Sequence, residues 1–311
     1  MLLKFKKILM LDWYKRKYFQ FLHKYFPKIY YRKKQKFDVH KYYLARTGKK
    51  LNLRNPQNIS EKLWWLALYW QNPLVVKCAD KYLMHEYVKE CGCEEILVPL
   101  YGVYDNAEEI NFDMLPRKFA LKCNHGCGYN ILCEDKSKID IKTIKKRLND
   151  WLLEKYGTEY CEFHYEKIKP KIICEEFLDF SGEKSLIDYK IHCLNGVPTF
   201  FFVCTERDVI TDKVIFTSYS LKWEKLSLLK NEGEADIPKP ECLEEIIHYA
   251  ELLSKPFPYV RVDLYNVDNK VYLGEMTFTP YANIMSYYKD STLKMMGEKL
   301  KLPQKYKSQS I

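Results

Sequence analysis

The sequence predicts a protein of the α+β class, with helices concentrated in its N-terminal part and antiparallel strands in its C-terminal part. Apolar residues at helical spacing dominate up to about residue 90, whereas short runs of β-branched and aromatic residues dominate after Pro170. The composition of 47% hydrophobic and 30% charged residues is typical of a globular chain that forms a core.

The helical part divides into several segments. Helices are expected within 38–72, with a break at Asn52–Asn58 around Pro56 and with Ser60 as the N-cap of the second helix. A further helix is expected from Leu74 to Glu90, and the apolar spacing over 141–152 predicts another.

The strand-rich part contains one strong hairpin signal, Asn195-Gly196, between two apolar runs. A helix that begins near Pro240 separates these runs from two final strands, which a turn at Asn266–Asn269 connects. The expected strands are 96–100, 119–123, 172–178, 186–194, 199–205, 214–219, 259–265 and 270–276.

The positive charge is concentrated at the N-terminus. Residues 1–36 contain twelve Lys or Arg and one acid, so the rest of the chain is almost neutral although the whole carries +10. Interleaved bases and aromatic rings suit the headgroup region of an anionic membrane surface, and equally a helical arm packed on a protein. The near-neutral body argues against nucleic acid as a partner.

Other classes of protein are excluded by what the chain lacks. No stretch approaches 18 apolar residues, and no clean secretion signal precedes the eleven cysteines, which indicates reduced thiols and a cytoplasmic location. No two C-x-x-C pairs are present, so a zinc–thiolate site is not expected.

A polar loop follows the expected strand 119–123. Lys122 lies at the end of that strand, and Asn124–Asn130 contains His125, Gly126 and Gly128. A glycine-containing loop frees backbone N–H groups for phosphate oxygens, and a neighbouring lysine adds a positive charge. Because no Walker motif is present, an ordinary tight turn remains the alternative.

Charged side chains also mark two later strands. Glu175 and Glu176 end one apolar run, where they could accept hydrogen bonds from a nucleotide or simply face water. In the next run, alternation places Asp188, Lys190 and His192 on one face of a strand, which therefore lines water or a polar site.

The strongest signal comes from the last two strands. With the turn at 266–269, Asp263 on one strand lies near Glu275 on the other, and Arg261 shares the face of Asp263. Two neighbouring carboxylates repel each other unless a cation lies between them, and Mg²⁺ is the natural occupant beside phosphate oxygens. Arg261 would meet an anionic substrate or a transferring phosphoryl group.

These motifs together resemble the TupA-like ATP-grasp family of bacterial surface-polysaccharide biosynthesis, within the ATP-grasp superfamily. The resemblance covers about residues 38–300 and is specific in the combination of motifs. It is carried by Asn55-Pro56, Ser60-Glu-Lys-Leu-Trp-Trp, Cys78-Ala-Asp-Lys-Tyr, Leu121-Lys-Cys-Asn-His-Gly, Asp188-Tyr-Lys and Gly274-Glu-Met-Thr-Phe.

The resemblance implies a nucleotide clamped between two α+β subdomains, with ATP and Mg²⁺ as cofactors. A basic aromatic arm over 1–37, expected from its composition, precedes the part that shows the resemblance, in which an N-terminal subdomain over 38–115, a lid over 116–180 and a catalytic subdomain over 181–311 are implied. The implied ATP-binding residues are Lys81, Lys122, His125, Gly126, Gly128, Glu175, Glu176 and Asp188, and the implied catalytic residues are Arg261 and Lys190. The implied metal ligands are Asp263 and Glu275. The superfamily's usual Glu-x-Asn pair is absent, because Thr277 stands two residues after Glu275, and Asn283 is the candidate substitute.

The activity that the resemblance implies is a carboxylate–amine ligase acting through an acyl phosphate. Its expected substrates are an amino acid or amino sugar and a uronic acid of a glycan, with the arm placing the enzyme at the inner face of the cell membrane. A glycan kinase that uses the same nucleotide site and a sugar-nucleotide-dependent glycosyltransferase are the alternatives, and a non-catalytic binding module is a weaker one.

Overall fold

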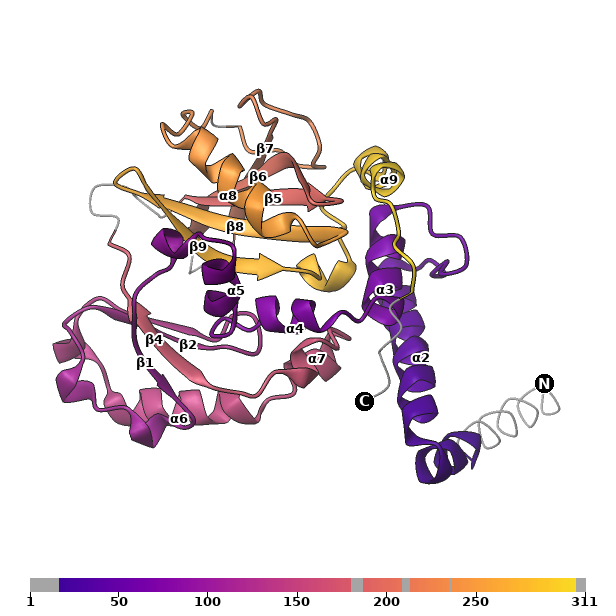
Figure 1. Cartoon of the computed structure of the whole chain (residues 1–311), viewed down its shortest axis with the longest axis horizontal. Helices are drawn as coiled ribbons and strands as arrows, with labels where there is room; N and C mark the ends of the chain where they lie inside the picture. Colours follow the sequence, from indigo (N-terminus) through magenta and orange to yellow (C-terminus); the bar gives the residue numbers. More distant parts are fainter. Residues whose placement is uncertain (1–16, 180–186, 209–212, 235, 306–311) are drawn as a thin grey trace. The chain divides into compact units, whose positions relative to one another are not determined.

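The computed structural model describes residues 17–179, 187–208, 213–234 and 236–305, and forms two compact units, residues 1–51 and 52–311. The first sixteen residues of the expected arm therefore lie outside the described part. The α+β prediction is confirmed: both sheets are entirely antiparallel and helices precede, separate and follow them (Figure 1).

The first unit is helical where it is described. A helix over 17–25 is followed by α2 (Pro27–Thr47), which starts at a proline and ends at Gly48 in the left-handed conformation, with φ of 68°. The exposed apolar side chains of this part of the unit are Tyr18, Phe21, Tyr25, Phe26, Ile29, Tyr31, Phe37 and Leu44. Within the described residues, no helix has both the length and the apolar character needed to cross a membrane.

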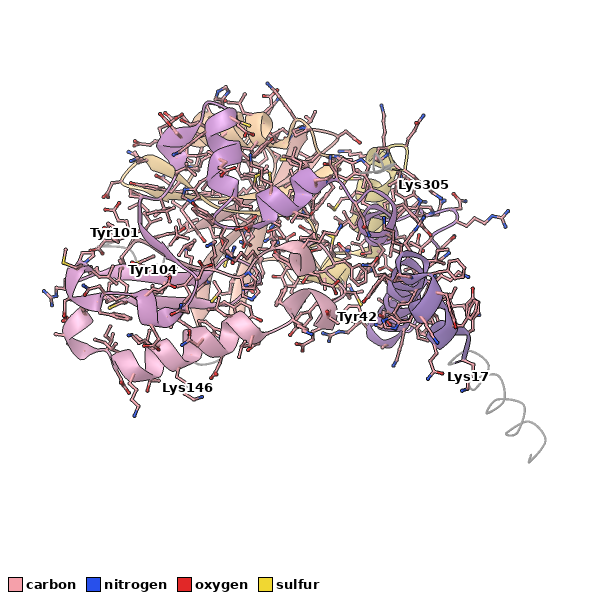
Figure 2. The ribbon with its side chains drawn as sticks, turned by 60° about the horizontal axis from the view of Figure 1, so that its bottom comes forward. Lys17, Tyr42, Tyr101, Tyr104, Lys146 and Lys305 are labelled. Carbon is pink, nitrogen blue, oxygen red and sulfur yellow. The ribbon has the colours of Figure 1, made fainter. Side chains whose placement is uncertain are left out.

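A four-stranded sheet lies in the first half of the second unit. Its order is β1 (Leu100–Tyr104), β4 (Ile172–Glu176), β2 (Phe119–Cys123) and β3 (Asn130–Cys133), and α6 (Ile141–Leu153) buries its apolar face against it. Gly102 in β1 leaves room for the Tyr104 side chain, labelled in Figure 2, whose hydroxyl oxygen lies 2.2 Å from where a Cβ of residue 102 would stand. The sequence pattern does not predict β3, which begins at Asn130, the last residue of the expected polar loop.

A five-stranded sheet forms the second half. Its order is β7 (Lys213–Tyr219), β6 (Val197–Asp208), β5 (Asp188–Leu194), β8 (Tyr259–Val267) and β9 (Lys270–Thr277). Helix α8 (Leu243–Ser254) contacts β5, β6 and β8 and shares a core with every second residue of β5, namely Tyr189, Ile191 and Cys193. The opposite face of β5, β8 and β9 is consequently left for polar side chains.

Helices α3 (Ile59–Tyr69) and α9 (Asp290–Lys299) contact each other and share a core with Phe200 and Phe202 of β6. The N-cap of α3 is Asn58, not Ser60 as expected, because Asn58 and Glu61 form a reciprocal capping box. The shorter elements are α7 (Tyr156–Glu159), η1 (Glu94–Ile96), η2 (Ala107–Glu109), η3 (Phe112–Met114), η4 (Lys136–Lys138), η5 (Tyr165–Lys167) and η6 (Pro280–Asn283).

Three expected elements differ in the structure. The helix expected over 74–90 is two helices, α4 (Pro73–Ala79) and α5 (Met84–Glu90), because the Asp80 side chain accepts the backbone N–H groups of Tyr82 and Leu83 and ends α4. The strand expected at 96–100 begins only at Leu100, after the turn of η1. The helix expected to begin near Pro240 begins at Leu243. The predicted subdomain boundaries stay predictions.

Candidate functional site

Three strands of the five-stranded sheet bring polar side chains to one face. Cα pairing places Lys190 opposite Asp263 and His192 opposite Arg261 between β5 and β8. Between β8 and β9, Asp263 is opposite Glu275. Asp263 and Glu275 are thus neighbours, as the turn between the two strands predicts. The polar face of β5 lies beside them.

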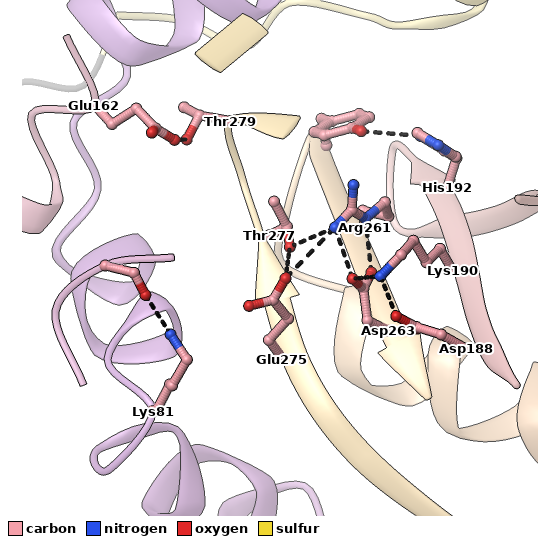
Figure 3. A network of polar contacts seen from close by, with 12 residues as sticks. Lys81, Glu162, Asp188, Lys190, His192, Arg261, Asp263, Glu275, Thr277 and Thr279 are labelled. Atoms are coloured by element: carbon pink, nitrogen blue, oxygen red, sulfur yellow. Dashed lines mark hydrogen bonds and ion pairs between the residues drawn. The ribbon is translucent and has the colours of Figure 1, made fainter. Parts of the chain in front are cut away.

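The centre of this face is an ion-pair network (Figure 3). Lys190 Nζ donates to Asp188 Oδ2 at 2.5 Å and to Asp263 Oδ2 at 2.6 Å. Arg261 holds both oxygens of Asp263, with Nε 2.7 Å from Oδ1 and Nη2 2.6 Å from Oδ2. The bidentate geometry fixes the guanidinium plane, so Arg261 is positioned before any ligand arrives.

Burial and charge oppose each other at Asp263, whose side chain is almost inaccessible to solvent, at 1%. Burial raises the pKa of Asp263, but Arg261 and Lys190 outweigh burial, so the pKa lies below its ordinary range. Burial lowers the pKa values of Lys190 and Arg261, but the neighbouring carboxylates keep both above their ordinary values. All three groups are therefore charged at neutral pH.

Glu275 differs from Asp263 in being partly open to solvent, with 29% of its side chain exposed. Its Oε1 accepts from Thr277 Oγ1 at 3.1 Å and faces Arg261 Nη2 at 3.5 Å, whereas its Oε2 has no hydrogen-bond partner among the described residues. Arg261 Nη2 also donates to Thr277 Oγ1 at 3.2 Å. Glu275 is therefore the carboxylate of this network that offers a free oxygen.

The residues present fit a magnesium ion in their chemistry. Carboxylate and amide oxygens are the ligands that Mg²⁺ takes. Glu275 supplies a carboxylate with an available oxygen, whereas both oxygens of Asp263 are held by Arg261 and Lys190, so Asp263 would bind the ion only by giving up one of these contacts. Asn283 is fully buried, and neither atom of its carboxamide has a hydrogen-bond partner in the part of the chain that the structure describes. It ends a run of three left-handed residues from Tyr281, a strained conformation that recurs at ligand sites. Within the described ranges, no three His, Cys, Asp or Glu side chains form a metal cluster by themselves.

His192 takes a structural part in the same face. Its Nδ1 lies 2.9 Å from the Tyr259 hydroxyl and its Nε2 lies 2.8 Å from the Tyr288 hydroxyl, so both ring nitrogens are satisfied. Burial, reinforced by Arg261 and Lys190, lowers the pKa of His192 far below its ordinary value. The imidazole is consequently neutral and adds no charge to the network.

The expected phosphate-binding residues form a second group. Lys81 Nζ donates to the carbonyl oxygen of Gly126 at 2.5 Å, which ties the α4–α5 break to the loop after β2. Asn124 strengthens this link, because its Nδ2 donates to Asp80 Oδ1 at 2.8 Å. Gly128 has φ of 81°, which only glycine adopts readily. The loop is thus held beside Lys81 by its backbone.

His125 and Lys122 are placed in different ways. His125 Nε2 lies 3.2 Å from the backbone oxygen of Trp151 in α6, and burial lowers the pKa of His125, so its imidazole anchors the loop to that helix. Lys122 forms an ion pair with Glu175 on the neighbouring strand β4. Glu176 follows Glu175 in the same strand and faces the other side of the sheet.

One residue of the site was missed from the sequence. Glu162 is buried, and it accepts a hydrogen bond from Thr279, which follows β9 (Figure 3). Burial raises the pKa of Glu162 to about 7, against the hydrogen bonds from Thr279 and Tyr156, and the charge of Glu275 raises it further. The charge of Lys81 lowers this pKa. Glu162 therefore interacts electrostatically with the ion-pair network, through Glu275, and with the second group, around the loop after β2, through Lys81. No motif surrounds Glu162, so no sequence signal could have identified it.

Comparisons with known proteins identify the family of the chain. Residues 61–301 match the model of a family described as TupA-like ATPgrasp. The fold is similar to that of an L-amino acid ligase from Bacillus licheniformis, with a TM-score of 0.50, 10% identity and coverage of 86% of this chain and 62% of that one. A D-alanine–D-alanine ligase from Bacillus anthracis complexed with ATP gives a TM-score of 0.44 and 15% identity over 72% of this chain and 66% of that one. The chain thus spans less than two thirds of the length of both ligases. No curated protein matches the chain.

Proposed function

Because the chain belongs to the TupA-like ATP-grasp family, we propose that it is an ATP- and Mg²⁺-dependent carboxylate–amine ligase of cell-surface polysaccharide biosynthesis. The observation that carries the proposal is the face of Arg261, Asp263 and Glu275, where a fixed guanidinium lies beside a carboxylate with a free oxygen. This is an arrangement suited to phosphoryl transfer, in which positioning and charge neutralisation supply most of the catalysis.

The proposed nucleotide site uses both groups of residues. Lys81 and Lys122 hold phosphate oxygens, and the loop with His125, Gly126 and Gly128 covers them. Glu175 or Glu176 receives the adenine, and Asp188 receives the ribose. The ion pair between Lys122 and Glu175 supports this assignment, because it brings two of these residues together at a place where the lysine side chain is still 20% exposed.

Arg261 and Lys190 are the proposed catalytic cations. A carboxylate oxygen of the substrate attacks the γ-phosphorus of ATP, ADP leaves, and an acyl phosphate forms. The amine nitrogen of the second substrate then attacks the acyl carbon and phosphate leaves. Arg261 stabilises the negative charge that develops on the transferring group, while Lys190 keeps Asp263 and Asp188 in place.

Asp263, Glu275 and Asn283 are the residues that would hold Mg²⁺. When bound, the ion neutralises phosphate charge and orients the γ-phosphate for transfer. Glu275 is the residue best placed to receive it, because its Oε2 is available and its side chain reaches solvent.

The proposed substrates are a uronic acid of a glycan and an amino acid or amino sugar. The described part of the N-terminal arm exposes aromatic rings among its lysines, which supports contact with the inner face of an anionic cell membrane. Such contact would keep the enzyme where lipid-linked glycans are assembled.

The first test is a thermal shift experiment with ATP and Mg²⁺, with ATP and EDTA, and with a panel of sugar nucleotides. Ligand at about 100 times its Kd adds about 2.7 kcal/mol of stability. Glu275→Gln should fold normally and lose the stabilisation by ATP and Mg²⁺, whereas Glu298→Gln, an exposed control, should keep it. Stabilisation by a sugar nucleotide alone would refute the proposal in favour of a glycosyltransferase.

Product analysis separates the ligase from the kinase. With a uronic acid, an amine and ATP, a ligase releases free phosphate in proportion to the amide formed. A kinase would leave the phosphate on the sugar and would not need the amine. Phosphate release that is independent of the amine would overturn the ligase assignment and leave the nucleotide site intact.

A further inference from the structure

A cavity lies at the end of the polar face and shares none of the charged residues described above. The volume of the cavity is about 50 Å³, which is several times the volume that one water molecule needs. Its walls come from α3, the start of α4, the segment around η5 and the ends of β8 and β9. Most of the lining is apolar, including Leu63, Leu66, Trp70 and Val75.

The cavity follows the ion-pair network along the same two strands. Tyr259 of β8 lines it, two residues before Arg261, and Thr279 lines it, two residues after Thr277. Arg261 and Thr277 are paired, so Tyr259 and Thr279 come next along the same face. Two residues of strand span about 7 Å, which is the length of a small molecule.

The polar groups of the cavity favour an anion together with an apolar group. Lys167 is the one charged residue in the lining, and no carboxylate belongs to the lining. Lys167 Nζ has a weak contact with Gln71 Oε1 at 3.3 Å, so it retains donors for a ligand. His164 also lines the cavity, and its buried Nε2 has no hydrogen-bond partner in the described part of the chain. Because burial lowers the pKa of His164 to about 3, the ring is neutral and adds no charge.

Thr279 also lines the cavity, and its hydroxyl donates a hydrogen bond to Glu162. A positive group near Thr279 would therefore face a carboxylate, whereas a negative group near Lys167 would face an ammonium. The apolar side chains that make up most of the lining disfavour a substrate that is polar throughout, such as a sugar.

We propose that this cavity binds the amine substrate, and that this substrate is an amino acid with a short aliphatic side chain. The side chain occupies the apolar wall, the carboxylate lies toward Lys167, and the amino group lies toward Thr279 and Glu162. The proposal rests on the ligase function proposed above, because only an amine-consuming reaction gives this ligand a use. It selects an amino acid over an amino sugar as the amine substrate.

The test measures binding of L-leucine through the intrinsic tryptophan fluorescence, to which Trp70 in the lining contributes, and through the melting temperature. 4-Methylpentanoate, which lacks the amine, and isopentylamine, which lacks the carboxylate, serve as probes of the two polar ends. L-leucine should bind at least tenfold more tightly than either probe. Glucosamine, which has an amine and no aliphatic side chain, should not bind.

Two variants test the position of the site. Ala67→Leu fills the cavity from α3 and should raise the Kd for L-leucine at least tenfold. Lys167→Gln removes the one positive charge of the lining and should raise it about fivefold, whereas Lys146→Gln, at an exposed lysine of α6, should leave it unchanged. The stabilisation by ATP and Mg²⁺ is measured on each variant and should be retained.

The outcomes separate this proposal from the ligase function. If ATP and Mg²⁺ stabilise the protein but L-leucine does not bind, the amino acid proposal is overturned and the nucleotide site stands. Equal binding of L-leucine to the parent protein and to both cavity variants would likewise overturn it. If L-leucine binds as expected but ATP does not, the cavity is confirmed as an amino acid site and the ligase function fails.

Discussion

Glu162 gives a prediction that does not depend on knowing any substrate. Burial raises the pKa of its carboxyl to about 7, whereas an unfolded glutamate has a pKa near 4.5. The folded protein therefore binds a proton between these pH values that the unfolded chain has lost, so stability is highest below about pH 4.5 and decreases as the pH rises through 7. A difference of about 2.5 pKa units corresponds to about 3 kcal/mol.

Glu162→Gln removes this ionisation and retains an oxygen that can accept the Thr279 hydroxyl. At pH 5 Glu162 is protonated in the folded protein but mostly ionised in the unfolded chain, so the variant should be more stable than the parent by less than about 1 kcal/mol. At pH 8 the variant should be more stable by about 3 kcal/mol, because it has no buried carboxylate at position 162. This difference is a substantial fraction of the total stability of an ordinary domain, which is about 5–15 kcal/mol.

Urea denaturation at pH 5, 6, 7 and 8, followed by circular dichroism, measures this difference. Glu298→Gln, an exposed glutamate in α9, is the matched control and should change stability equally at every pH. If the difference between Glu162→Gln and the parent stays constant from pH 5 to 8, Glu162 titrates near its ordinary value. The inference that burial raises the pKa of Glu162 to about 7 would then be wrong.

Three other predictions concern the site and the loop. Asp263→Asn should destabilise the protein by about 3–5 kcal/mol in denaturant, because it leaves Lys190 buried with reduced compensation, and equal stability would contradict the network. Cys127, the most exposed of the cysteines, should react with N-ethylmaleimide more slowly in the presence of ATP and Mg²⁺, with Cys127→Ser as the control for labelling elsewhere. Gly126→Ala should lower the melting temperature, because a Cβ there would stand 2.6 Å from the Tyr129 ring, and an unchanged melting temperature would show that the ring moves aside.

The parts of the site that could be predicted from the sequence are those that local periodicity determines. Alternation along β5 places Asp188 and Lys190 on one face whatever the partner strand is, and a short turn brings Asp263 opposite Glu275. The α+β class follows in the same way from the order of helical and strand patterns. These inferences use residues that are close in the sequence, so they need no knowledge of the topology.

The parts that could not be predicted depend on distant contacts. Lys190 binds Asp263 only because β5 pairs with β8, across 73 positions of the sequence. Glu162 becomes part of the site only through Thr279, 117 positions away. The break after α4 could not be predicted either, since its apolar residues continue at helical spacing and only the hydrogen bonds of Asp80 reveal the end.

The charges of the polar face also explain why the proposed nucleotide site needs a divalent cation. Asp188, Asp263 and Glu275 contribute three negative charges, and Lys190 and Arg261 contribute two positive charges, so the network carries a net charge of −1. An approaching triphosphate would be repelled by such a surface. The excess negative charge resides on Glu275, because the other two carboxylates are closely paired with Lys190 and Arg261. A magnesium ion at Glu275 would reverse the sign of the surface at the point where the proposed function places the γ-phosphate, while the guanidinium of Arg261 stays fixed beside it.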